Sequence, residues 1–129
     1  MGELFSVYAK TDGSSTTGTC NLYSDLFYGT TPPTYIRIPK GMKLKIWAKR
    51  IYGTVATQFN IQYTHDVTAA SPSYIDVEIE NLASAGEMSL EKRRPIILRG
   101  FTGKEAIKVT WTQSTAGNAA LHLDIEISE

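Results

Sequence analysis

The sequence predicts an all-β fold, a single-domain antiparallel β-sandwich with about eight or nine strands. Three observations support this prediction. Threonine, isoleucine, valine and the aromatic residues together make up about a third of the chain, and such side chains favour a pleated, half-buried surface. Apolar and polar residues alternate with a period of two in several segments, as in antiparallel strands with one face in a core and the other in water. Turn-forming residues separate these segments at intervals of about 8–12 residues.

The N-terminal third contains the less regular strands. Strands are expected at 3–10, at about 20–28 and at 34–38. A loop rich in Gly and Ser at 11–18 separates the first two, because these residues suit the backbone angles of turns. The strand, IPKG turn and strand at 36–46 are similar to the openings of jelly-roll domains. This resemblance implies a sandwich of the jelly-roll type.

The clearest alternation lies in the middle and in the C-terminal half of the chain. It predicts strands at 42–51, 55–67, 74–80, 105–112 and 121–128. Each of these strands has one apolar face, and that face is expected to line the core. The predicted core residues are Leu44, Ile46, Phe59, Ile61, Val77, Ile79, Val109, Trp111, Leu123 and Ile125.

Two segments near residue 90 are harder to interpret. The segment 82–94 can form a helical turn capped by Ser84 and Glu87, or a further strand. The segment 95–99 starts with a continuous apolar run, which suits a strand covered on both sides. No linker, repeat or low-complexity segment interrupts the chain, so we expect one domain over residues 1–129.

Composition argues against several classes of protein. Thirteen Lys and Arg residues balance thirteen Asp and Glu residues, so the net charge is zero, whereas duplex-DNA-binding domains are usually strongly basic. The single cysteine excludes a disulfide framework and a cysteine-based zinc site. No apolar run is long enough for a membrane span. The N-terminus has neither a basic region nor an apolar stretch of signal-peptide length. We therefore expect no metal, no cofactor and no membrane span, and a cytoplasmic or virion location.

The histidines do not form a recognisable catalytic motif. His65 and Asp66 are adjacent on a strand and point to opposite faces. His122, Asp124 and Glu126 share a face and could hold a metal, but the same alternation is typical of any solvated strand face. No nucleophile motif such as G-x-S-x-G occurs. We therefore expect no catalytic residues and a protein that is not an enzyme.

A second row of carboxylates is formed by Asp76, Glu78 and Glu80. Residues two apart on a strand are about 7 Å apart, so three such carboxylates cannot all reach one calcium ion. We expect this row to be a solvated strand face.

One strand face combines cationic side chains with an aromatic ring. It carries Lys43, Lys45, Trp47 and Lys49, and we predict that it is the interaction surface of the protein. Cations beside a ring are used in single-stranded nucleic-acid grooves, but the zero net charge and the absence of an RNP-like motif argue against nucleic acid. In a competing interpretation, the loop at 29–34, with Tyr28 and Tyr35, folds over Trp47 and makes it part of a second small core.

Charges are segregated along the chain. Residues 37–50 contain six basic and no acidic residues, and residues 51–91 contain six acidic and no basic residues. A second basic group and a final acidic group follow; they consist of Lys92, Arg93, Arg94 and Arg99, and of Asp124, Glu126 and Glu129. These blocks can neutralise each other across neighbouring strands, or form separate faces that meet between subunits in a ring or a lattice. Because lysine on an edge strand prevents uncontrolled pairing, the basic strand is expected at an edge.

Together these patterns favour a non-enzymatic structural protein that self-associates, most simply a virion coat or capsid-decoration type of subunit. This expectation is an analogy at the level of the fold. It predicts a homo-oligomer, with a trimer preferred, or a protein lattice. A carbohydrate-binding module or an adhesin-like ligand-binding domain is the alternative, because seven tyrosines and two tryptophans allow a sugar-stacking surface. Single-stranded nucleic-acid binding is a further alternative.

Overall fold

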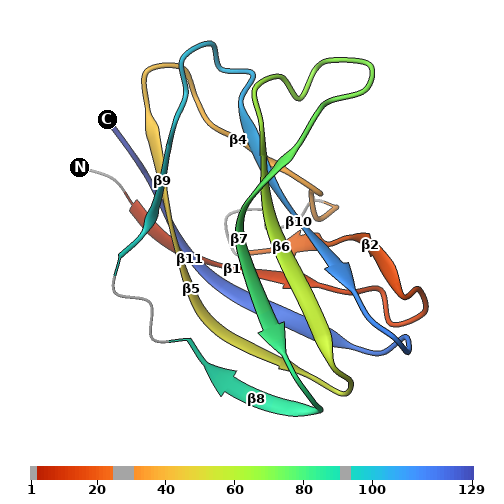
Figure 1. Ribbon diagram of the computed structural model, residues 1–129. Helices are drawn as coiled ribbons and strands as arrows, with labels where there is room; N and C mark the ends of the chain where they lie inside the picture. Colours follow the sequence, from red (N-terminus) through yellow and green to blue (C-terminus); the bar gives the residue numbers. More distant parts are fainter. Residues whose placement is uncertain (1–2, 25–30, 91–93) are drawn as a thin grey trace.

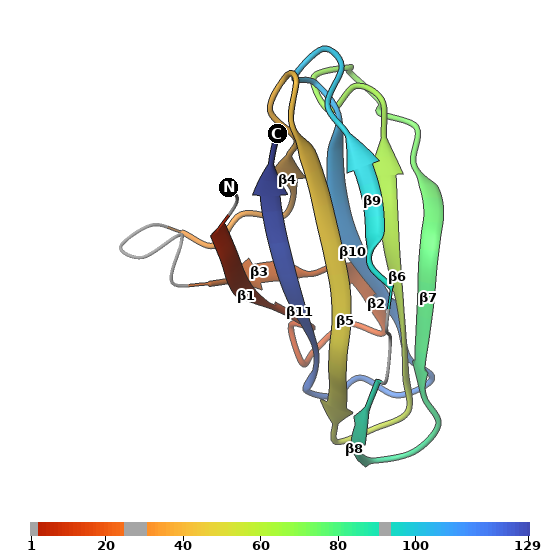
Figure 2. The same ribbon diagram turned by 90° about the vertical axis from the view of Figure 1, so that its left-hand side faces the viewer.

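The computed structural model describes residues 3–24, 31–90 and 94–129. Within these ranges it contains eleven strands and no helix (Figure 1). The strands form two antiparallel sheets that pack against each other (Figure 2). The predicted β-sandwich is therefore confirmed.

Sheet A has six strands and sheet B has five. Sheet A has the order β3-β1-β11-β5-β8, with β9 also paired to β5, and sheet B has the order β2-β10-β6-β7, with β4 also paired to β10. The strands are β1 (Glu3–Lys10), β2 (Thr17–Thr19), β3 (Asn21–Tyr23), β4 (Ile36–Arg37), β5 (Lys43–Gly53), β6 (Thr57–Thr64), β7 (Ile75–Leu82), β8 (Gly86–Ser89), β9 (Ile96–Arg99), β10 (Ala106–Thr112) and β11 (Ala119–Ser128).

Eight of the strands pair in a nested order. The first pairs with the last, β1 with β11, and the pairing continues inward through β4 with β10, β5 with β9 and β6 with β7. This is the pattern of one long hairpin wound into two sheets, which is the jelly-roll arrangement. The short strands β2, β3 and β8 are added to this framework. β3 lies within the strand expected at about 20–28, whereas β2 and β8 bring the number above the eight or nine that were expected.

One apolar cluster fills the space between the two sheets. Cys20 belongs to it and is fully buried. Eight of the ten predicted core residues are buried in this cluster: Leu44, Ile46, Phe59, Ile61, Val109, Trp111, Leu123 and Ile125. Burying an aliphatic or aromatic side chain of this size stabilises a fold by roughly 1.5–3 kcal/mol, so this cluster accounts for most of the hydrophobic stabilisation.

Strand β7 departs from the predicted alternation. Ile79 is 44% exposed, whereas Glu80 is only 5% exposed. One extra residue, Val77, interrupts the register between β6 and β7. An inserted residue moves the side chains that follow it to the opposite face. The prediction that Ile79 lies in the core is therefore wrong, and so is the prediction that Asp76, Glu78 and Glu80 form one solvated face.

Two other expectations about the strands are wrong, and one open alternative is decided in part. The lysine-bearing β5 is not an edge strand, because it pairs with β11 on one side and with β8 and β9 on the other. Its lysines can be accommodated there because they alternate with buried residues and so point away from the core. Strand β9 is not covered on both sides, since Ile97 is 51% exposed. In the segment 82–94, for which a helical turn or a strand was expected, Gly86–Ser89 forms strand β8, and residues 91–93 lie outside the described residues. Residues 25–28 of the strand expected at about 20–28 lie outside the described residues.

Candidate functional site: the two outer sheet faces

The outer face of sheet A, which we call face A, carries most of the predicted interaction residues. Lys43, Lys45 and Trp47 of β5 lie opposite Ser128, Glu126 and Asp124 of β11. The residues between them, Leu44 and Ile46, are buried in the core. Trp47 is half-buried on this face.

Lys49 is displaced from this row by a bulge. The register between β5 and β11 shifts next to His122, and within these strands no residue of β11 lies opposite Lys49. Ala48 stays buried, and Arg50 takes the outward position opposite His122. The structure therefore aligns three of the four predicted residues and leaves Lys49 exposed at the bulge.

Basic and acidic blocks that are separate in the sequence meet on face A. Lys45 Nζ lies 3.8 Å from Glu126 Oε1, and Arg50 Nη1 lies 3.1 Å from Glu87 Oε1. Both pairs are partly exposed, so each contributes about 1 kcal/mol or less to stability. At these points the blocks neutralise each other across neighbouring strands. Lys92 and Arg93 of the second basic group lie outside the described residues.

Two exposed apolar residues flank the Lys45–Glu126 pair. The strand register places Leu4, Glu126, Lys45 and Ile97 in one row across β1, β11, β5 and β9. Leu4 is 60% exposed and Ile97 is 51% exposed. The sequence patterns did not identify either residue as a surface residue, because both lie in segments that read as ordinary strands. Their exposure adds apolar area to the face that was predicted from its lysines and tryptophan.

Ser6, Asp124 and His122 form a polar cluster on the same face. The Ser6 hydroxyl donates a hydrogen bond of 3.1 Å to Asp124 Oδ1, and His122 Nε2 lies 3.4 Å from the same oxygen. The His122 ring stacks on Tyr8 with 4.6 Å between the ring centroids. In a catalytic triad the histidine lies between serine and carboxylate and takes the serine proton. Here the carboxylate lies between the other two groups, so the cluster orders side chains but does not activate a nucleophile.

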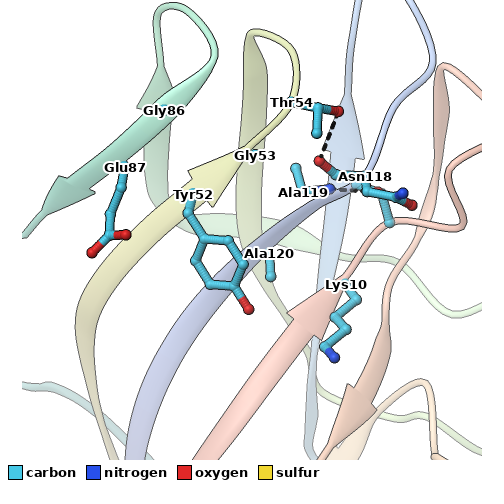
Figure 3. Close-up of a pocket in the computed structure, with 10 residues that line it drawn as sticks. Lys10, Tyr52, Gly53, Thr54, Gly86, Glu87, Asn118, Ala119 and Ala120 are labelled. Atoms are coloured by element: carbon cyan, nitrogen blue, oxygen red, sulfur yellow. Dashed lines mark hydrogen bonds between the residues drawn. The ribbon is translucent and has the colours of Figure 1, made fainter.

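A hollow of about 620 Å³ lies at one end of face A (Figure 3). The hollow lies over a row of residues that crosses four neighbouring strands, β8, β5, β11 and β1. These residues are Glu87, Tyr52, Ala120 and Lys10. Ala120 itself is only 2% exposed, and the longer side chains of Tyr52 and Lys10 on either side of it line the hollow. The guanidinium group of Arg50 lies 4.8 Å from the centroid of the Tyr52 ring and helps to hold that ring in place.

The outer face of sheet B, which we call face B, is polar but carries few charges. On β6, β10 and β2 the register aligns Gln58, Asn60 and Gln62 with Thr112, Thr110 and Lys108, and with Thr17 and Thr19; on β7 the same face carries Asp76 and the 44% exposed Ile79. Asp76 Oδ1 accepts hydrogen bonds from Gln62 Nε2 at 2.9 Å and from Asn60 Nδ2 at 3.1 Å. These bonds lower the pKa of Asp76. The T-x-T sequences at 17–19 and 110–112 are the signal from which this face could have been found.

A slot lies at one end of face B. A 2.8 Å hydrogen bond from the Val67 amide to the Lys104 carbonyl fixes the loop at 65–74 in this position. Between this loop and the residues before β4 is a hollow of about 330 Å³, lined by Tyr35 and Tyr74 among others. Lys108 Nζ lies 3.9 Å from the centroid of the Tyr74 ring.

The position of Tyr35 tests one part of the competing interpretation of Trp47. Tyr35 lines the slot on face B, whereas Trp47 lies on face A. The expectation that Tyr35 helps to cover Trp47 is therefore wrong, and Tyr28 lies outside the described residues.

Among the described residues, no group of three His, Cys, Asp or Glu side chains is placed to hold a metal ion. Within the same ranges, no helix is long and apolar enough to cross a membrane. No protein-family model matches the sequence, and no curated protein matches it. Function must therefore be inferred from the residues themselves.

Proposed function

We propose that this protein is a non-enzymatic structural subunit that self-associates through face A into a homo-oligomer, with a trimer preferred, or into a lattice. The observation that carries the proposal is the row in which Leu4 and Ile97, 60% and 51% exposed, flank the Lys45–Glu126 pair. Apolar side chains gathered on one face with a half-buried tryptophan are typical of contact surfaces. A virion coat or a capsid-decoration layer is the kind of assembly that such a subunit would build.

The charges on face A suit a second copy of the same face. Lys43 and Lys45 on β5 lie beside the acidic residues Asp124 and Glu126 on β11. A rotation axis near these strands brings the basic column of one copy against the acidic column of another. Charge pairs of this kind contribute orientation and association rate more than affinity. The hollow beside Tyr52 gives face A a recess, into which a projecting side chain of a second copy can fit.

The nucleic-acid alternative has less support. A carboxylate lies beside Lys45 at 3.8 Å and beside Arg50 at 3.1 Å, which lowers the positive potential that a phosphate would meet there. Asp124, directly opposite Trp47, would repel a phosphate placed near the indole ring. A carbohydrate-binding or adhesin-like role is the second candidate, and the uncharged polar side chains of face B favour it.

Sedimentation velocity on purified protein tests the self-association. At tens of micromolar and physiological salt we expect an assembly that dissociates on dilution. Ile97→Lys should weaken it by about 2 kcal/mol or more, which is about thirtyfold in the dissociation constant. Ile79→Lys is the matched control, because Ile79 is 44% exposed but belongs to sheet B.

Urea denaturation of both variants shows whether they fold equally well. A clean monomer under these conditions contradicts the proposal. Equal weakening by Ile97→Lys and by Ile79→Lys removes face A as the contact surface.

A further inference from the structure

We propose that the slot between Tyr35 and Tyr74 binds one ring of a neutral carbohydrate, whose chain continues along face B. The site lies on the sheet opposite face A. It does not depend on the proposed self-association.

The slot has a volume and an aromatic lining that suit a sugar ring. Its volume of about 330 Å³ is near the lower end of the range of ligand pockets. Tyr35, from the segment before β4, is 41% exposed, so its ring is available to a ligand. The face of an aromatic ring is electron-rich, whereas the C–H groups on one face of a pyranose carry partial positive charge. A sugar ring therefore stacks favourably on Tyr35.

Tyr74 also lines the slot, and its ring is held in position. Lys108 Nζ lies over its ring, 3.9 Å from the centroid, and such a contact contributes about 0.5–1 kcal/mol at an exposed site. Because the Tyr74 side chain is already ordered, it loses less conformational entropy when a ligand binds.

The surface beyond the slot offers hydrogen-bonding groups without net charge. Thr19 lines the slot and lies opposite Thr110, which in turn lies opposite Asn60 on the next strand. Threonine hydroxyls both donate and accept hydrogen bonds, and an asparagine amide does the same. Sugar hydroxyls have the same dual character, so a glycan chain laid across these strands can form a bond at successive residues.

The charges favour a neutral ligand over an anionic one. Lys108 is in the same row as Gln62 and Asp76. Asp76 accepts hydrogen bonds from Gln62 and Asn60, at 2.9 Å and 3.1 Å, which stabilise its charged form. Because this row holds one carboxylate and one ammonium group, it carries no net charge, and a phosphate chain or an acidic glycan gains little electrostatic attraction there.

An NMR titration of the isotope-labelled full chain tests the proposal. The probes are neutral hexasaccharides of glucose, mannose, xylose, galactose and N-acetylglucosamine at millimolar concentration. At least one of them should shift the amide signals of Thr34, Tyr35, Tyr74 and Lys108 in a saturable way. A thymidine dodecamer and a heparin hexasaccharide are titrated separately as anionic probes.

Substitutions of exposed tyrosines identify the site. Tyr35→Ala should weaken sugar binding about tenfold, as expected for the loss of one stacking ring. Tyr35→Phe keeps the ring and should bind within about threefold of the unmodified protein. Tyr23→Ala is the matched control, since Tyr23 is 39% exposed but lies on β3 of sheet A, and it should leave binding unchanged.

The proposal is overturned if no neutral sugar in the panel shifts these signals, or if Tyr35→Ala binds as tightly as Tyr23→Ala. It is also overturned if an anionic probe occupies the slot more tightly than every neutral sugar. Ile97→Lys should not affect sugar binding, so a failure of self-association and a failure of this site can be told apart.

Discussion

Glu105 stabilises the loop that follows β9, and its removal should have a large, pH-dependent cost. The carboxylate is almost completely buried. It accepts hydrogen bonds from the amides of Phe101 at 3.0 Å, Thr102 at 3.2 Å and Gly103 at 3.1 Å. The Thr102 hydroxyl donates a further bond of 3.2 Å. Burial raises the pKa of Glu105, but the hydrogen bonds outweigh burial and lower the pKa from 4.5 to about 2.

The lowered pKa sets the size and the pH range of the effect. One unit of pKa corresponds to about 1.4 kcal/mol, so the charged form of Glu105 contributes about 3 kcal/mol to the free energy of unfolding. Because the pKa is lower in the folded state, this contribution is fully present above pH 4.5 and is lost as the pH falls towards about 2. Glu105→Gln keeps the shape of the side chain but removes its charge. It also replaces a carboxylate oxygen, which accepts hydrogen bonds, by an amide NH2 group that faces the N–H donors of the loop. We expect it to cost about 3 kcal/mol at neutral pH.

Urea denaturation of both proteins at a series of pH values between about 7 and about 2 measures this cost. The difference between the two free energies of unfolding should shrink steadily below pH 4.5. Glu126→Gln is the control, because Glu126 belongs to a partly exposed ion pair and its loss should cost under about 1 kcal/mol. A Glu105→Gln cost that is equal at both ends of the pH series would refute the role of the charge. A cost under about 1 kcal/mol at neutral pH would show that the loop amides do not hold the carboxylate.

Three further predictions concern the core and face A. Phe59→Ala should lower the free energy of unfolding by about 3–5 kcal/mol because Phe59 is fully buried, and an unchanged urea midpoint would contradict that placement. Gly18→Ala should displace the Trp111 ring, since a Cβ atom at Gly18 would lie 2.5 Å from Trp111 Cη2. Its expected cost is about 1–3 kcal/mol, and an unaltered near-ultraviolet circular dichroism spectrum would argue against the contact. In a Trp111→Phe background, acrylamide should quench Trp47 fluorescence in dilute monomer and less so in the assembly. Full shielding of Trp47 at every concentration would place the contact surface elsewhere than on face A.

The period-two alternation was sufficient to predict the fold class and most of the core. Phe59 and Ile61 on β6, and Leu123 and Ile125 on β11, are fully buried as predicted. The direction of a side chain on a regular strand follows from its position along that strand, so it is local information. The same rule failed at Ile79, because a bulge is a mismatch between two strands and is not visible in one strand alone.

For the candidate surfaces, the sequence patterns predicted only which residues share a strand face. They placed Lys43, Lys45 and Trp47 together because alternate residues of one strand point the same way. The tertiary structure was needed to bring Leu4 and Ile97 into the same row as Lys45, and Tyr35 and Tyr74 into the lining of one slot. These residues come from distant parts of the chain. Their pairing is decided when the nested strands close over a common core, because the register that buries all the apolar faces at once is a property of the whole sandwich.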